Sequence, residues 1–241
     1  MKKNRSVLFA AFLFASMLIL SSCKSCTKSS NASIPYDIVS ISDTSTYADV
    51  DISYPQFEKL STLNKSIEHT VLEERYAEFM STVQERWQEI NAAHKAMGAS
   101  EDLPPLEYIV SCEPIINGPD YISMLFTTYV YTGGAHGETL LESLTYDVAA
   151  QKMLSITDIS NLSLNEIATY CNEHFLQTLN YGGEDVESQD SRKDWIAEGT
   201  APEEYNYQIF TFDGTTLTVY FEPYIVAPYA YGVQKVEIPI Q

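Results

Sequence analysis

The chain has 241 residues, 45% of them hydrophobic and 12% aromatic, and its 33 acidic residues outnumber 14 basic ones to give a formal net charge of −19. This acidic excess argues against nucleic acid, and against anionic membrane or wall polymers, as direct ligands, because like charges repel. Two interpretations stay open. The charge either attracts a cationic partner over long range or only keeps the protein soluble.

The first 22 residues have the pattern of a secretory signal. Basic residues stand within positions 2–5, and an apolar run broken only by Ser16 covers residues 7–20. That run is shorter than the roughly 20 residues that a membrane-spanning helix needs, and small residues follow it. We therefore expect a signal peptide over residues 1–22.

Leu20-Ser21-Ser22-Cys23 resembles the bacterial lipobox, in which leucine and two small residues precede a cysteine. The resemblance implies acylation of Cys23 with palmitate-type chains and cleavage before it. The product would be a lipoprotein of the cell envelope, at the outer membrane or on the periplasmic side in a diderm host. Several acyl chains anchor stably, since each buried CH₂ contributes about 0.8 kcal/mol. Loss of residues 1–22 removes three basic residues and no acidic one, which changes the net charge from −19 to −22.

Residues 23–35 are rich in Ser, Thr, Lys and Asn and are predicted to form a flexible tether. Roughly 200 residues remain, enough for one large domain or two small ones. We place an N-terminal subdomain at 36–150 and a C-terminal one at 151–241.

Alternating apolar residues predict the strands of the first subdomain at 36–41, 47–54, 106–116, 121–131 and 138–148. Between the second and third strands, apolar residues recur at helical spacing from Leu60 to Ile90, and Gly98 can end the resulting amphipathic helix. Asn117-Gly118-Pro119-Asp120 has the composition of a turn.

The second subdomain opens with a capping box, Ser163 and Glu166, ahead of an amphipathic helix that reaches Leu179. Residues 184–204 are acidic and poorly periodic, with one short helical piece around Trp195. Asp213-Gly214 predicts a hairpin, and the strands fall at 205–212, 215–221 and 233–240. Strand runs interrupted by single helices predict an α+β fold of two small subdomains, each a helix packed on a mostly antiparallel sheet.

Two cysteines, Cys112 and Cys171, lie inside the predicted folded part. An exported protein reaches a compartment where disulfides persist, so the two thiols could form a bridge. We favour two separate buried thiols over the bridge, and spacing alone cannot pair them.

Two segments carry the candidate site. Thr132-Gly133-Gly134-Ala135-His136-Gly137 follows a predicted strand, and the glycines allow positive φ or a close approach. His136 is either a general base or metal ligand, or a structural and partner-contact residue. No H-x-H or H-x-x-x-H spacing accompanies it, so we expect no metal, no cofactor and no catalytic residue. The segment Phe221–Gly232 contains Tyr224, Tyr229 and Tyr231, which form either a ligand platform or an inward-packing loop.

These two segments together resemble an envelope domain family typified by the ectodomain of the RsiV-type anti-sigma factor and the N-terminal region of the PdaC-type peptidoglycan deacetylase. The resemblance spans about residues 36–240. It implies two α+β subdomains and no uniform function. Some members bind lysozyme, others precede a deacetylase domain, and many are free-standing lipoproteins of unknown function. Since this sequence stops at Gln241, soon after its last strand, we expect neither a transmembrane anti-sigma arm nor an appended deacetylase domain.

We therefore expect a membrane-anchored, non-catalytic binding module of the cell envelope. By resemblance, its partner would be a cationic protein such as lysozyme, contacted through Gly133, Gly134, His136 and the three tyrosines. Two alternatives stay open. The first is an enzyme that modifies envelope glycan through His136, a peptidoglycan deacetylase or hydrolase. The second is a lipoprotein with a purely structural or assembly role.

Overall fold

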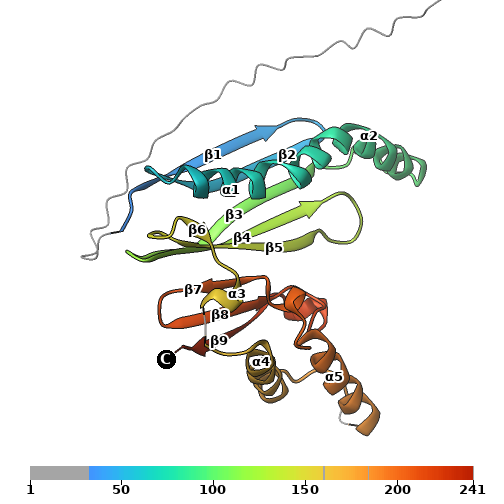
Figure 1. The fold of residues 1–241 in the computed structure, drawn as a ribbon. Helices are drawn as coiled ribbons and strands as arrows, with labels where there is room; N and C mark the ends of the chain where they lie inside the picture. The colour runs from blue at the N-terminus through green and yellow to red at the C-terminus, as the bar shows by residue number, and fades with distance from the viewer. Residues whose placement is uncertain (1–32, 160, 184, 241) are drawn as a thin grey trace, which may run out of the picture.

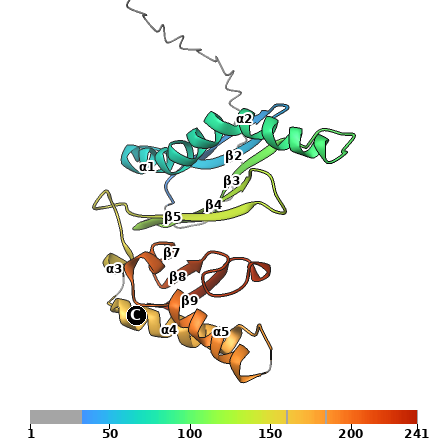
Figure 2. The same cartoon turned by 90° about the vertical axis from the view of Figure 1, so that its right-hand side faces the viewer.

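The computed structural model describes residues 33–159, 161–183 and 185–240. The predicted signal peptide, Cys23 and most of the predicted tether lie outside these residues. Four layers follow one another in Figures 1 and 2: two helices, a six-stranded sheet, a three-stranded sheet and two further helices. The predicted α+β class is confirmed.

The six-stranded sheet runs in chain order, β1 to β6, and only its β2–β3 pair is parallel. Its strands are β1 (Tyr36–Thr44), β2 (Ala48–Phe57), β3 (Leu106–Asn117), β4 (Tyr121–Tyr131), β5 (Glu138–Asp147) and β6 (Lys152–Met153). The sequence predicted five of them and missed β6. Because β6 pairs with β5, residues 152–153 belong to the first unit and not to the second. Ile34 is also tied to this unit by two hydrogen bonds with Asn117, so the folded part begins before the predicted end of the tether at residue 35.

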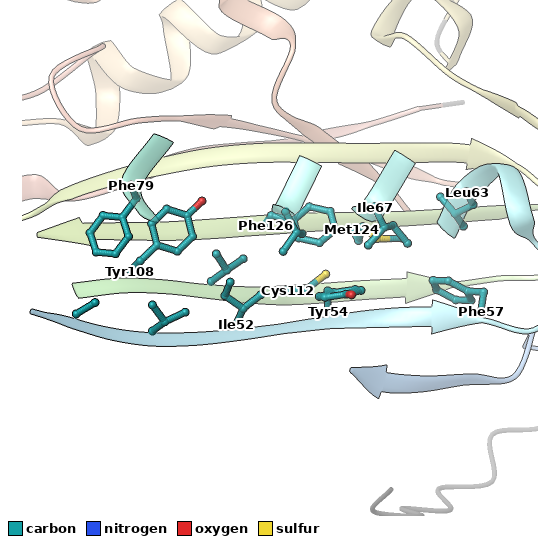
Figure 3. Close-up of a cluster of buried hydrophobic side chains, with 14 of the residues drawn as sticks. Ile52, Tyr54, Phe57, Leu63, Ile67, Phe79, Tyr108, Cys112, Met124 and Phe126 are labelled. Atoms are coloured by element: carbon teal, nitrogen blue, oxygen red, sulfur yellow. The ribbon is translucent and has the colours of Figure 1, made fainter. Parts of the chain in front are cut away.

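The predicted long helix is two helices, α1 (Ser61–Leu72) and α2 (Glu74–Ala96), interrupted at Glu73. Their buried residues stand four apart: Leu63, Ile67 and Val71, then Phe79, Val83 and Trp87. Each step of four residues turns a helix by about 400°, so such a stripe drifts about 40° per step. The interruption lets each helix turn its own stripe toward the sheet. All six belong to one core with residues of β2, β3 and β4, and Figure 3 shows Leu63, Ile67 and Phe79 meeting side chains of that sheet.

The second unit comprises helices α3 (Ile156–Ile159), α4 (Leu164–Thr178) and α5 (Val186–Gly199), short 3₁₀ turns η1 (Glu204–Tyr207) and η2 (Tyr229–Tyr231), and strands β7 (Phe210–Phe212), β8 (Thr216–Phe221) and β9 (Gln234–Pro239). The capping box is confirmed, because the Ser163 Oγ accepts from the Glu166 N–H and the Glu166 carboxylate accepts from the Ser163 N–H. The hairpin is confirmed as well, with Gly214 at φ 98°.

Two predictions for this unit were wrong. Residues 205–209 are not strand, since η1 occupies their start. The short helical piece is a helix of 14 residues, α5, capped by the Asp185 side chain. Only Ile196 and Gly199 of α5 are buried, which explains why its sequence shows little apolar periodicity.

The helices of the first unit and the second unit pack on opposite faces of β4. Ile122, Met124 and Phe126 face the helices of the first unit, as the predicted alternation requires. Ser123 faces the second unit, where its hydroxyl accepts from the Phe212 N–H at 3.0 Å, and Leu125 packs there in a small apolar cluster completed by Leu141 and Tyr220.

The disulfide considered from the sequence does not form. Cys112 belongs to the core of the first unit and Cys171 to the core of the second, and both are free thiols. Burial raises the pKa of each thiol to about 12, so neither forms the reactive thiolate near neutral pH. Among the described residues, no helix combines the length and the apolar character needed to cross a bilayer.

Candidate functional site

The loop between β4 and β5 takes its shape from glycines. Gly133 and Gly134 have φ of 94° and 116°, a region that residues with a Cβ rarely adopt. A Cβ on Gly133 would also lie 2.5 Å from the Ile90 Cδ1 of α2. The Tyr131 hydroxyl donates to the Gly134 carbonyl at 3.1 Å and ties the loop down. These two glycines therefore shape the loop.

The segment after β8 holds Tyr224 in a strained backbone conformation. Its φ is 74°, which is rare for a bulky residue. Hydrogen bonds fix the position, from the Tyr224 N–H to the Ala227 carbonyl at 3.0 Å and from the Trp195 Nε1–H to the Tyr224 carbonyl at 2.9 Å. The side chain is nevertheless 55% exposed, so its ring is presented to solvent.

The structure brings the two segments together, although they lie about ninety residues apart in the chain. The His136 and Tyr229 rings stack with centroids 4.3 Å apart and planes 23° apart. The Tyr229 hydroxyl donates to the Gly137 carbonyl at 3.2 Å, and the Tyr224 ring lies 5.6 Å from that of Tyr229. The His136 Nδ1 lies 2.9 Å from the Gly137 carbonyl, which favours the tautomer protonated on Nδ1.

A groove of about 340 Å³ is lined by the β4–β5 loop, the start of β5 and residues 222–229, and we call it the motif groove. His136, Tyr224 and Tyr229 line it together with two glutamates, Glu138 and Glu222. The Glu222 Oε1 accepts from the Leu141 N–H at 2.6 Å and thereby caps the open edge of β5. Glu138 is exposed. Neither glutamate was among the predicted contact residues, although Glu138 directly follows the first motif and Glu222 lies within the segment Phe221–Gly232.

Tyr231 lies outside this groove. Its hydroxyl donates to the Asn180 carbonyl at 2.7 Å, and its ring packs 5.6 Å from that of Tyr181. The predicted set therefore divides. Three of its members line the groove, two glycines shape the loop, and Tyr231 belongs to a separate aromatic cluster beside α5.

The chemistry of the groove suits a cationic group. Aromatic faces attract cations, and carboxylates pair with ammonium or guanidinium groups. Within the residues that the structure describes, His136 forms no ion pair with a carboxylate, and no three His, Cys, Asp or Glu side chains gather as metal ligands would.

Comparison with known proteins finds a different family match for each of the two parts of the chain. The family model described as deacetylase PdaC matches residues 41–139, and that of a protein family of unknown function, DUF3298, matches residues 156–241. The chain is 33% identical over 121 residues to the peptidoglycan-N-acetylmuramic acid deacetylase PdaC of Bacillus subtilis. That match spans 48% of this chain and only 24% of the enzyme. The matches confirm the resemblance predicted from the motifs, and likeness to an enzyme of peptidoglycan indicates a cell-envelope protein.

Two solved structures share the fold. A DUF3298 family member from Bacteroides fragilis superposes with a TM-score of 0.61 at 18% identity, covering 87% of this chain and 92% of that one. A DUF3298 family protein from Pseudomonas aeruginosa gives a TM-score of 0.52 at 15% identity with the same coverage. At these identities the likeness concerns the fold alone.

Proposed function

We propose that this chain, which joins a PdaC-type domain to a DUF3298-type domain, is a lipid-anchored, non-catalytic binding module of the cell envelope. The motif groove is its contact surface, and its partner is a cationic protein such as a lysozyme. One observation carries the proposal. Two sequence motifs from different units converge on a single groove that presents exposed aromatic rings and two carboxylates.

The charge of the chain supports a cationic partner. A net charge of −19 attracts such a protein over long range, and the attraction weakens as salt screens it. At the groove, Tyr224 and Tyr229 offer rings for cation–π contact, and Glu138 offers a carboxylate in reach of solvent.

Calorimetric titration with a lysozyme at low and at high salt tests the proposal. We expect binding at low salt that weakens at high salt. Absence of binding at low salt would remove lysozyme as the partner, because screening can only reduce this attraction.

A matched pair of variants tests the location. Glu138→Gln, in the groove, and Glu173→Gln, exposed on α4, each remove one negative charge. Since the net charge changes equally, only a direct contact makes the first variant bind more weakly than the second. Equal affinities would place the contact elsewhere.

Membrane attachment is tested separately. We expect labelled palmitate to enter the protein, and we expect the Cys23→Ala variant to be released from membranes. A Cys23→Ala variant that stays equally firmly with membranes would refute the lipid anchor.

One observation favours a second function, modification of envelope glycan. The His136 imidazole and the carboxylates of Glu138 and Glu222 line the same groove, and an acid and a base are the groups that such a reaction requires. Activity on peptidoglycan fragments that is lost in His136→Ala, with the fold intact, would establish this function in place of the first.

A further inference from the structure

A second hollow lies beneath helix α2, between that helix and strands β3 to β5, and we call it the α2 cleft. Its volume is about 380 Å³, within the range of small-molecule sites, which begins at about 300 Å³. Its apolar wall consists of Phe79 and Val83 from α2 and Leu106 and Tyr108 from β3, all buried. The cleft shares the end of the β4–β5 hairpin with the motif groove but opens toward α2.

Two arginines stand on the α2 side of this cleft. Arg75 and Arg86 are eleven residues apart, close to three helical turns, so they share one face of α2. Among the described residues, no carboxylate forms an ion pair with Arg75, and Arg86 makes only a loose one with Glu89 at 3.7 Å. The Arg75 guanidinium acts on the half-buried Glu142 carboxyl, whose pKa it lowers against the effect of burial, but the two form no direct ion pair. The guanidinium N–H groups can therefore still donate to an anionic ligand.

Tyr108 supplies an independent observation. Its side chain is only 2% exposed, yet its hydroxyl forms no hydrogen bond with any described residue. Burial, and to a lesser extent the nearby Glu142 carboxyl, raises the pKa of this phenol to about 12, while Arg75 acts in the opposite direction. The hydroxyl therefore keeps its proton and remains a donor. Figure 3 shows the Tyr108 ring beside that of Phe79, with its hydroxyl at the far end of the ring. The hydroxyl is not sealed from solvent, and it can donate a hydrogen bond to an acceptor bound in the cleft.

The acidic groups nearby limit the charge of the ligand. Glu78 and Glu138 also line the cleft and balance the two arginines in number, but both are exposed to solvent. Such a rim does not attract a polyanion. It suits a molecule with a single anionic group, oriented by Arg75, and an uncharged body.

We propose that the α2 cleft binds a small anionic amphiphile. One carboxylate or sulfonate head accepts hydrogen bonds from Arg75 and the Tyr108 hydroxyl, and the apolar body lies on Phe79, Val83 and Leu106. The proposal for this site does not rest on the partner proposed for the motif groove, although Glu138 lines both hollows.

The probe is 8-anilino-1-naphthalenesulfonate, an apolar ring system with one sulfonate, whose fluorescence rises in apolar sites. Titrated into the full chain, it should saturate at one site per chain. Arg75→Gln should weaken its binding at least about ten-fold, as expected for loss of one charge-assisted hydrogen bond. Arg192→Gln, which removes the same charge from α5, should leave the affinity unchanged. Equal affinities of the two variants would overturn the proposal.

Two further measurements separate charge from shape. The uncharged N-phenyl-1-naphthylamine, the same ring system without the sulfonate, should bind wild type and Arg75→Gln equally. Thr82→Trp, which fills the cleft from the exposed surface of α2, should abolish binding of both probes, whereas Ser81→Trp beside it should not. Undiminished binding in a folded Thr82→Trp variant would place the probe elsewhere and refute the site. Thermal unfolding verifies that each variant folds. If a tryptophan variant does not fold, Arg75→Gln still tests the proposal, because Arg75 is exposed and its replacement leaves the core intact.

Discussion

Tyr224 has a backbone conformation that favours glycine, and the chain nevertheless places an exposed aromatic ring there. A non-glycine residue in this region costs about 1–3 kcal/mol, and such strain gathers at functional sites. We expect Tyr224→Gly to leave the melting temperature unchanged or higher, because relief of strain offsets the added freedom of the unfolded chain. Lysozyme affinity should fall nonetheless, as calorimetry can measure.

The control for this variant is Lys59→Gly, which has a similar φ of 63° and lies outside the groove. It should match Tyr224→Gly in stability and wild type in affinity. If Tyr224→Gly binds as tightly as Lys59→Gly, the ring makes no contact with the partner.

Glu142 is a second residue in unfavourable surroundings, because they disfavour the ionised form of its carboxyl. Burial is the main cause of its raised pKa; Arg75 acts against that shift, and Glu222 and Glu74 add to it. The pKa of the Glu142 carboxyl is higher in the folded state than in the unfolded state. The protonated carboxyl therefore contributes stability that is fully present below the unfolded-state pKa and is lost as pH rises through the folded-state pKa. Glu142→Gln should therefore raise the melting temperature at pH 7, and the gain should shrink near pH 4. Gains of equal size at both pH values would contradict this assignment.

At the scale of elements, the capping box of α4 offers a quantitative test. Ser163→Ala removes the acceptor for the Glu166 N–H, and loss of an N-cap costs about 1 kcal/mol. Urea unfolding should show that loss. Ser66→Ala, at a partly exposed position within α1, serves as the control and should change little. A Ser163→Ala variant as stable as the control would mean that the cap adds nothing to the stability of the unit.

The elements also show which parts of the fold a sequence can predict. The bounds of β4 were predicted as found, because strict alternation ends in a turn at one end and a glycine loop at the other. Helix α5 was largely missed, because it contacts the core through so few residues that no periodic signal arises. The candidate site, too, could be predicted from the sequence only in part. Each motif was visible locally, but the stacking of His136 on Tyr229 depends on how two units pack, which local patterns do not encode.

At the scale of the whole molecule, the packing of the two units predicts cooperative unfolding. The Ser123 hydroxyl accepts from the Phe212 N–H and also bonds the Thr145 hydroxyl, and all three residues are buried. A unit that separated from its neighbour would leave these groups and the Leu125 cluster without partners, so separation costs both units stability.

The chain contains two tryptophans, one in each unit, which makes this cooperativity measurable. Trp87 lies in α2 and Trp195 in α5, so Trp195→Phe reports on the first unit and Trp87→Phe on the second. In each background the remaining fluorescence and the far-ultraviolet circular dichroism should follow one urea transition. Ser123→Ala, which leaves the buried Phe212 N–H without an acceptor, should lower both transitions together by about 1–3 kcal/mol. A shift confined to one tryptophan, or two separate midpoints in one background, would mean that the units unfold independently and that their contact serves mainly to assemble the motif groove.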